Sequence, residues 1–279
     1  MQTSPEMVAT HPSPLDPTPG LLRLMGPAAS DFLQGQVTQD LRDLPVDYWT
    51  RAALCTAQGR VLALLKVLRV PDGLWLLMPA ERVAPVRTHL QRFVLRTKVQ
   101  LLAAAPLVVT VETGPTDLVA TTAASHHAPV EWRGEARVLA LSTNRRLVVS
   151  AAAAGQASVD PAGWAAWIQA CVADEEPEVF TASAASWTPH MLAQDRWQAI
   201  SLTKGCYTGQ EIVARTHYLG KNKRRLERVH WATTDALPSP GAALDLPDGR
   251  RGEWVLGLTG AQGTDGLVVT TLPEAPTSA

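Results

Sequence analysis

The segment from residue 204 to residue 211 reads Lys204-Gly205-Cys206-Tyr207-Thr208-Gly209-Gln210-Glu211. Its cysteine lies between two glycines, with a lysine before it and a carboxylate after it. Glycine allows left-handed and close-approach backbone conformations, so amide groups here can face a ligand. Lys204 can favour the thiolate of Cys206 electrostatically, which predicts a nucleophile, a ligand or a sulfur handler. The alternative is a glycine turn with Cys206 as a small buried hydrophobic residue, the usual environment of a free cysteine.

Two earlier blocks and an extension accompany this octapeptide. The extension is Ile212-Val213-Ala214-Arg215, and the earlier blocks are Phe32-Leu33-Gln34-Gly35-Gln36-Val37-Thr38-Gln39-Asp40-Leu41 and Ala53-Leu54-Cys55-Thr56-Ala57-Gln58-Gly59-Arg60. In this order and spacing they resemble the YgfZ-type folate-binding proteins associated with iron-sulfur cluster assembly, within the glycine-cleavage T-protein superfamily. The resemblance runs from about Leu21 to the C-terminal segment and is weakest between Pro106 and Pro161.

The resemblance implies an α+β fold of two intertwined α+β subdomains plus a small C-terminal β-barrel, arranged around a central folate-binding opening. We place a flexible, proline-rich leader at 1–20 and a folate-binding α+β region at 21–225. An inserted subdomain falls at about 49–102 of that region. The small β-barrel domain takes 226–279.

Hydrophobic spacing independently favours an α+β architecture, because helix and strand patterns alternate irregularly without an internal repeat. One helix is predicted behind Glu81. A second follows Pro161, where Trp164, Trp167, Ile168 and Cys171 form an apolar stripe that makes Cys171 a core residue. Aliphatic runs bounded by turn residues predict antiparallel strands at 61–70, 74–78, 136–141, 146–150, 226–231, 253–259 and 266–272.

Composition indicates a globular protein. The chain has 279 residues, 46% hydrophobic content and a formal net charge of −1, enough for sizeable cores in two or three domains. No apolar run approaches the roughly 18 to 20 residues needed to cross a bilayer, and no secretory pattern opens the chain. We therefore expect a cytoplasmic protein without a membrane partner.

No metal site is predicted. Cys55, Cys171 and Cys206 are too scattered for a disulfide framework or a C-x-x-C pair. The spacing of His126, His127, His190 and His217 relative to Cys206 also differs from the usual metal-ligand patterns.

A folate site needs an apolar slot for the pterin, a carboxylate or carbonyl for its donor edge, and cations for the glutamate tail. By resemblance we assign Gln36, Thr38 and Asp40 to this site, for tetrahydrofolate or a derivative. The alternative is a helix that begins near Pro27 and ends at Gly35, with side chains that bind only backbone.

The octapeptide and its extension supply the other site residues. By resemblance, Cys206 and Lys204 are the reactive residues. The folate contacts expected here are Gly205, Tyr207, Gln210, Glu211 and Arg215. Trp164 and Trp167 fit a helix core, and Trp231 and Trp254 fall in barrel-like strands. Trp187 and Trp197 are the tryptophans that flank the approach to Cys206.

A basic strip follows the motif, formed by Arg215, Lys221, Lys223, Arg224, Arg225 and Arg228. It can bind polyglutamate or RNA phosphate, or it can be a solvated strand edge where lysines discourage pairing. We do not predict direct binding of nucleic acid.

Two departures from the family pattern bear on the folate site. Glu175 stands where the family carries a helix-terminating glycine before Pro177, and the arginine of that run is also missing. The segment Pro189-His190-Met191-Leu192-Ala193 lacks an acidic residue that many relatives carry.

Two functions follow from the resemblance. The first is a folate-dependent accessory protein for assembly, repair or maintenance of iron-sulfur clusters. Its partners would be cluster-containing client enzymes or assembly factors, including those of tRNA modification. The alternative is a tetrahydrofolate-dependent aminomethyl or methyl transferase, which needs a carboxylate near the folate to activate the amine.

Overall fold

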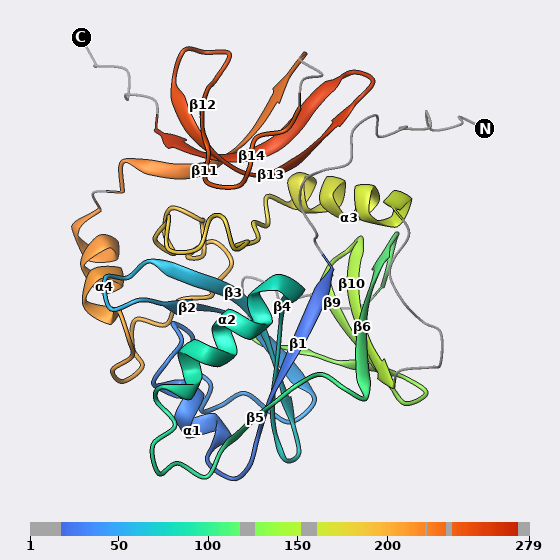
Figure 1. Cartoon of the computed structure of the whole chain (residues 1–279), viewed down its shortest axis with the longest axis vertical. Helices are drawn as coiled ribbons and strands as arrows, with labels where there is room; N and C mark the ends of the chain where they lie inside the picture. The colour runs from blue at the N-terminus through green and yellow to red at the C-terminus, as the bar shows by residue number, and fades with distance from the viewer. Residues whose placement is uncertain (1–17, 118–125, 152–160, 221, 233–235, 273–279) are drawn as a thin grey trace.

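The computed structural model describes residues 18–117, 126–151, 161–220, 222–232 and 236–272 (Figure 1). Within these ranges it contains three antiparallel sheets and four helices, so the predicted mixed α+β class is confirmed. The predicted leader lies mostly outside the described residues. Strand β1 (Pro19–Met25) overlaps the last two residues of the predicted leader, 19 and 20.

A six-stranded antiparallel sheet forms the centre of the fold. Its strands, in spatial order, are β5 (Gln100–Leu102), β1, β4 (Gly73–Pro79), β3 (Val61–Val70), β2 (Tyr48–Cys55) and β7 (Ala128–Pro129). Strands β2, β3 and β4 are buried almost throughout, because both faces of the sheet are covered. This explains why β3 reads as a mainly apolar run, interrupted by Lys66 and Arg69, rather than as an alternating one.

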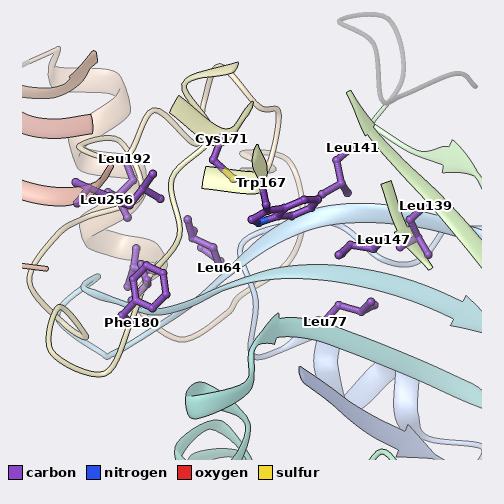
Figure 2. Packing of buried hydrophobic residues seen from close by; sticks show 14 of the residues in the cluster. Leu64, Leu77, Leu139, Leu141, Leu147, Trp167, Cys171, Phe180, Leu192 and Leu256 are labelled. Atoms are coloured by element: carbon purple, nitrogen blue, oxygen red, sulfur yellow. The ribbon is translucent and has the colours of Figure 1, made fainter. Parts of the chain in front are cut away.

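Two hydrophobic clusters cover the two faces of this sheet. One contains Leu22, Leu24 and Leu54 of the sheet together with residues of α1 (Ala29–Gln34) and α2 (Ala80–Gln91). The other contains Trp49 and Leu64 of the sheet with residues of α3 (Pro161–Asp174). Figure 2 shows Trp167 and Cys171 of α3 in this second cluster. Cys171 is fully buried, as its place in the helical stripe predicts.

Two four-stranded sheets complete the described fold. The first has the order β6 (Leu107–Thr113), β10 (Arg145–Ala151), β9 (Ala136–Ser142) and β8 (Glu131–Arg133). The second has the order β11 (Arg224–Trp231), β14 (Gly263–Thr271), β13 (Arg251–Gly260) and β12 (Ala243–Asp245). Helix α3 contacts β6 of the first sheet and β13 and β14 of the second. It therefore joins the C-terminal sheet to the rest of the molecule (Figure 1).

Every strand and both helices predicted from hydrophobic spacing are present, with limits that differ by a few residues. The C-terminal strands form an antiparallel sheet, and its closure into a barrel stays a prediction. Strand β1 pairs with β4 and β5, so the central sheet extends beyond the predicted inserted subdomain. The domain limits themselves stay predictions. No helix in the described ranges is long and apolar enough to cross a bilayer.

Candidate functional site

The Lys204 side chain joins the cysteine motif to the first sequence block. Its ammonium group donates hydrogen bonds of 2.7 Å to the backbone carbonyls of Gln34, Val37 and Gln39. The side chain is 4% exposed, and burial lowers the pKa of Lys204 to about 8. An ammonium group has three protons, and these carbonyls accept all of them. Lys204 therefore holds the turn after α1, and its predicted effect on the Cys206 thiolate stays untested.

Thr38 joins the first block to the second block and to the segment before the cysteine motif. Its hydroxyl donates a 2.5 Å hydrogen bond to the carbonyl of Ala199 and accepts one of 2.9 Å from the backbone N–H of Ala53. The Ser201 N–H in turn donates to the Thr38 carbonyl at 2.9 Å. Thr38 is fully buried. Its hydroxyl thus binds only backbone here, as the helix-end alternative proposes, and a role toward folate stays a prediction.

Two glycines bring the second block against the cysteine motif. Gly209 has φ +87°, and a Cβ atom placed on it would lie 2.5 Å from the carbonyl oxygen of Thr56. Gly59 has φ +68°, and its Cβ would lie 2.9 Å from Cβ of Ile212. Side chains are excluded at both positions by sterics and by the left-handed backbone. The three sequence blocks therefore meet at the start of α4 (Gln210–Leu219).

Cys206 lies on the outside of this junction. Among the three cysteines it alone is exposed, whereas Cys55 and Cys171 are buried. A Cβ on the neighbouring Gly205 would meet nothing within 4 Å, so the backbone beside the thiol is open to solvent. The alternative reading of Cys206 as a small buried core residue is wrong. An exposed thiol on a supported loop can react with a partner or a small molecule.

Tyr207 follows Cys206 but points inward. Its ring is 7% exposed and lies 5.1 Å from the Lys204 ammonium, and burial raises the pKa of its phenol. The phenol oxygen is buried and has no hydrogen-bond partner in the described part of the chain. The same holds for Oε1 of Gln36 in the first block. These two groups are free to take a hydrogen bond from water or a ligand.

The other predicted contacts are spread over the surface of the junction. Asp40 is half-buried and pairs with Arg42 at 2.5 Å, and the hydrogen bonds from Arg42 hold the pKa of its carboxyl well below the usual range. Gln210 is half-buried at the start of α4. Glu211 and Arg215 are exposed on the same helix. Gln210, Glu211 and Arg215 therefore lie on the helix that directly follows the cysteine motif, and their contact with folate stays a prediction.

Three arginines of the basic strip form ion pairs. Arg224 pairs with Glu253 at 3.0 Å, Arg225 pairs with Asp195, and Arg228 pairs with Asp265 at 3.5 Å. These partners lie on β13, on the segment before the cysteine motif and on β14. The pairing favours the strand-edge interpretation of the strip over a continuous surface for phosphate. Lys221 lies outside the described residues.

A separate cavity lies between the central sheet and α3. This narrow cavity of about 20 Å³ is lined by Pro19, Lys66, Met78, Pro79, Leu147, Trp167, Ile168, Glu178 and Phe180. Lys66 and Glu178 supply its charges, and most of the other lining side chains are apolar. Its volume fits about one water molecule. Lys66 pairs with Oε1 of Glu178, whereas Oε2 of Glu178 is buried without a hydrogen-bond partner in the described residues.

Further buried ion pairs lie beside Lys66. Glu176 accepts a 2.9 Å hydrogen bond from Arg51 and pairs with Arg145, and its carboxylate lies 3.8 Å from the Lys66 ammonium. Burial opposes the ionisation of Glu176, but these three cations outweigh it and lower its pKa well below the usual range. Burial raises the pKa of Glu178, with Lys66 opposing the shift. Lys66 thus lies between the ionised carboxylate of Glu176 and the carboxylate of Glu178, which lines the cavity and is only partly hydrogen-bonded.

The cavity and the cysteine motif lie at different places along β3. The motif contacts the turn at Gly59, just before β3 begins at Val61, whereas the cavity is lined by Lys66. Five residues of extended strand span roughly 17 Å. The cavity was not predicted from the sequence, because the apolar stripe of α3 indicates only a core position for Trp167. In the structure Trp167 belongs to the core and also lines the cavity. Trp187, a sequence candidate for pterin stacking, is fully buried, and its indole N–H donates a 2.6 Å hydrogen bond to the Glu253 carboxylate.

Comparison with known proteins places these observations in context. No protein-family model matches the chain. It is 30% identical over 254 residues to the tRNA-modifying protein YgfZ of Yersinia enterocolitica, covering 85% of this chain and 73% of that protein. It is 27% identical over 241 residues to the protein of the same name from Vibrio atlanticus, with the same coverage.

The fold also matches a solved structure. The crystal structure of the glycine cleavage system aminomethyltransferase T from Bartonella henselae superimposes with a TM-score of 0.68 and 14% sequence identity. The match covers 91% of this chain and 76% of that one. At this identity the likeness establishes the shared fold.

Proposed function

Because this chain belongs to the family of the tRNA-modifying protein YgfZ, we propose that it is a folate-dependent accessory protein for iron-sulfur clusters. In this role it serves their assembly, repair or maintenance and supports cluster-dependent enzymes of tRNA modification. Tetrahydrofolate or a derivative binds at the cavity beneath α3. The exposed Cys206 acts on the client protein or the assembly factor.

The observation that carries this proposal is the free Oε2 atom of Glu178. It is buried, lacks a hydrogen-bond partner among the described residues, and faces a cavity that Trp167 and Phe180 also line. A pterin has a flat ring and a donor edge that a carboxylate can accept. Aromatic rings offer a flat pterin a stacking surface. The cavity therefore supplies two of the three features that a folate site requires.

Binding requires the cavity to open. Its present volume holds about one water molecule, so side chains of the lining must move before a pterin can enter. Lys66 lines the cavity and is a cation for the glutamate tail, although it already contacts the carboxylate of Glu178. Arg51 is a second cation close to it, because both contact the carboxylate of Glu176. A ligand carboxylate would compete with these buried ion pairs.

Cys206 acts apart from the pterin in this proposal. The thiol is exposed, and the loop that carries it is anchored by the buried ammonium of Lys204. A supported and accessible thiol can meet a client protein without entering the folate cavity. The distance along β3 between the two sites supports this separation.

Replacement of Cys206 tests the chemical half of the proposal. In cells that lack the native gene, Cys206→Ala should fold and accumulate normally but fail to restore the activity of cluster-dependent enzymes. Cys171→Ser, at a buried position, serves as a variant whose effect on these enzymes should follow its loss of stability instead. Full restoration by Cys206→Ala would remove the thiol from the proposal.

The alternative is a tetrahydrofolate-dependent aminomethyl or methyl transferase. The fold shared with aminomethyltransferase T and the carboxylate of Glu178 in the cavity favour it. Purified protein would then form methylenetetrahydrofolate only when the aminomethyl donor is added. Such donor-dependent formation would replace the accessory role, whereas folate binding without turnover supports it.

A further inference from the structure

His190 is a buried histidine without a hydrogen-bond partner. Its side chain lies in the segment before the cysteine motif, is 4% exposed, and makes no hydrogen bond through Nδ1 or Nε2 within the described residues. A buried imidazole normally satisfies at least one of its nitrogens, and an exception calls for an explanation such as an absent water or ion.

A second imidazole faces it from α4. The ring centroids of His190 and His217 lie 5.7 Å apart, with the ring planes inclined by 44°. The two rings do not hydrogen-bond to each other, because both nitrogens of His190 lack a partner. His217 is exposed, so one side of the pair is open to solvent.

This separation fits two ligands of one metal ion. With Zn–N bonds of about 2.0–2.1 Å, two imidazoles on the same ion hold their centroids roughly 5–6 Å apart. Imidazole nitrogen suits zinc, copper and nickel, whereas calcium and magnesium prefer oxygen. The chemistry of the pair therefore selects a transition-metal dication.

We propose that His190 and His217 form a binding site for a divalent transition-metal ion of the zinc class, which links the segment before the cysteine motif to α4. Water completes the coordination of the ion at this site. No set of three His, Cys, Asp or Glu residues is arranged to hold a metal in the described ranges, so the protein supplies two ligands as it stands.

Asp195 is the carboxylate that acts electrostatically on His190. Its Oδ1 atom is buried without a hydrogen-bond partner in the described chain, while its other oxygen pairs with Arg225. Asp195 and Arg225 are the charged groups that act on His190, together with His217. Because Asp195 already neutralises Arg225, the guanidinium does not leave a net positive charge beside the two imidazoles.

The site would stiffen the support of Cys206. Helix α4 begins at Gln210, only four residues after Cys206, and the segment of His190 continues to Ala199, whose carbonyl binds Thr38. An ion that ties His190 to His217 therefore fastens two of the elements that hold the cysteine loop. Metal binding to the folded state alone raises its stability by mass action.

Titration of Zn²⁺ into the full chain carrying Cys206→Ser tests the proposal, since this substitution removes the exposed thiol as a competing ligand. We expect one equivalent of Zn²⁺ to bind and to raise Tm. His217→Gln and His190→Gln should each weaken binding by about tenfold or more, because the site loses one of its two protein ligands. His217 is exposed, so its variant should fold whether or not His190→Gln does.

His230→Gln is the matched control, because His230 is exposed and lies 3.4 Å from Asp265, on β14 of the C-terminal sheet. It should bind Zn²⁺ like the parent. Absence of saturable binding by the parent would overturn the proposal. Equal binding by His217→Gln and the parent, or an equal loss in His230→Gln, would overturn it as well.

Discussion

The ammonium group of Lys204 donates a 2.7 Å hydrogen bond to the backbone carbonyl of Gln34, which lies 170 residues earlier in the chain. Two further carbonyls of the same turn accept its remaining protons. One side chain thereby joins two of the three sequence blocks on which the family resemblance rests. The lysine of the cysteine motif is first of all a structural residue of this junction.

Lys204→Met should destabilise the protein by about 3 kcal/mol or more, because it leaves three buried carbonyls without a donor and each unsatisfied group costs about 1–3 kcal/mol. The free energy of unfolding in urea measures this loss. Lys223→Met, at an exposed lysine, should change stability by less than about 0.5 kcal/mol. Similar stabilities for the two variants would show that the carbonyl contacts contribute little.

Gly209→Ala should destabilise the protein more than Gly220→Ala does. Both glycines have positive φ angles, so alanine adds backbone strain of roughly 1–3 kcal/mol at either position. A Cβ at Gly220 meets nothing within 4 Å, whereas at Gly209 it meets the Thr56 carbonyl at 2.5 Å. The difference between the two unfolding free energies measures the close approach. Equal effects would contradict a tight junction at Gly209.

Glu175→Gly should stabilise the protein by roughly 1 kcal/mol. Glu175 follows α3 with φ +53°, a conformation that favours glycine, and its N–H donates to the carbonyl of Val172. The glycine of the family pattern thus corresponds to a left-handed helix end, which this chain keeps with a glutamate. Glu175→Ala keeps the strain and loses the exposed pair with Arg196, so it should bring no gain. Thermal unfolding distinguishes the glycine variant from the alanine variant. A lower Tm for Glu175→Gly than for the wild type would contradict backbone strain at residue 175.

Glu176→Gln should cost about 3–5 kcal/mol near pH 7, because it breaks a buried ion pair and leaves the guanidinium groups of Arg51 and Arg145 undercompensated. The folded pKa of Glu176 lies below its ordinary value of 4.5, so the folded state binds fewer protons than the unfolded state below that pH. Wild-type stability should therefore fall as pH decreases from about 4.5, and the gap between wild type and variant should narrow. Urea unfolding from pH 7 to pH 3 tests this. A constant difference between the unfolding free energies of wild type and Glu176→Gln would contradict a lowered pKa of Glu176 in the folded state. The exposed Glu135→Gln serves as the control, and its stability should follow that of the wild type at every pH.

The sequence predicted the elements better than their assembly. The mainly apolar run of β3 and the helical stripe of α3 could be assigned from the sequence, and the burial of Cys171 followed from that stripe. The order of the central sheet depends on pairing across long separations, such as β1 with β4 and β5, which local patterns do not encode.

The candidate site was predicted only in part. The exposed position of Cys206 agrees with a reactive thiol, but the partners of Lys204 are backbone carbonyls, which carry no sequence signature. The cavity was missed because Glu178 and Lys66 lie far apart in sequence and Trp167 fitted a core stripe equally well. The contact of His190 with His217 was missed for the same reason, because no regular spacing relates these residues.

Calorimetric titration of tetrahydrofolate into the pure protein tests the folate account most directly, with wild type compared with Glu178→Gln, Glu135→Gln and Cys206→Ala. We predict saturable binding by wild type, by Cys206→Ala and by Glu135→Gln. Binding to Glu178→Gln should weaken by about tenfold or more, since a hydrogen bond to a charged group contributes about 1.5–3 kcal/mol. No binding by wild type, or equal binding by a folded Glu178→Gln, would contradict a folate site at the Glu178 cavity.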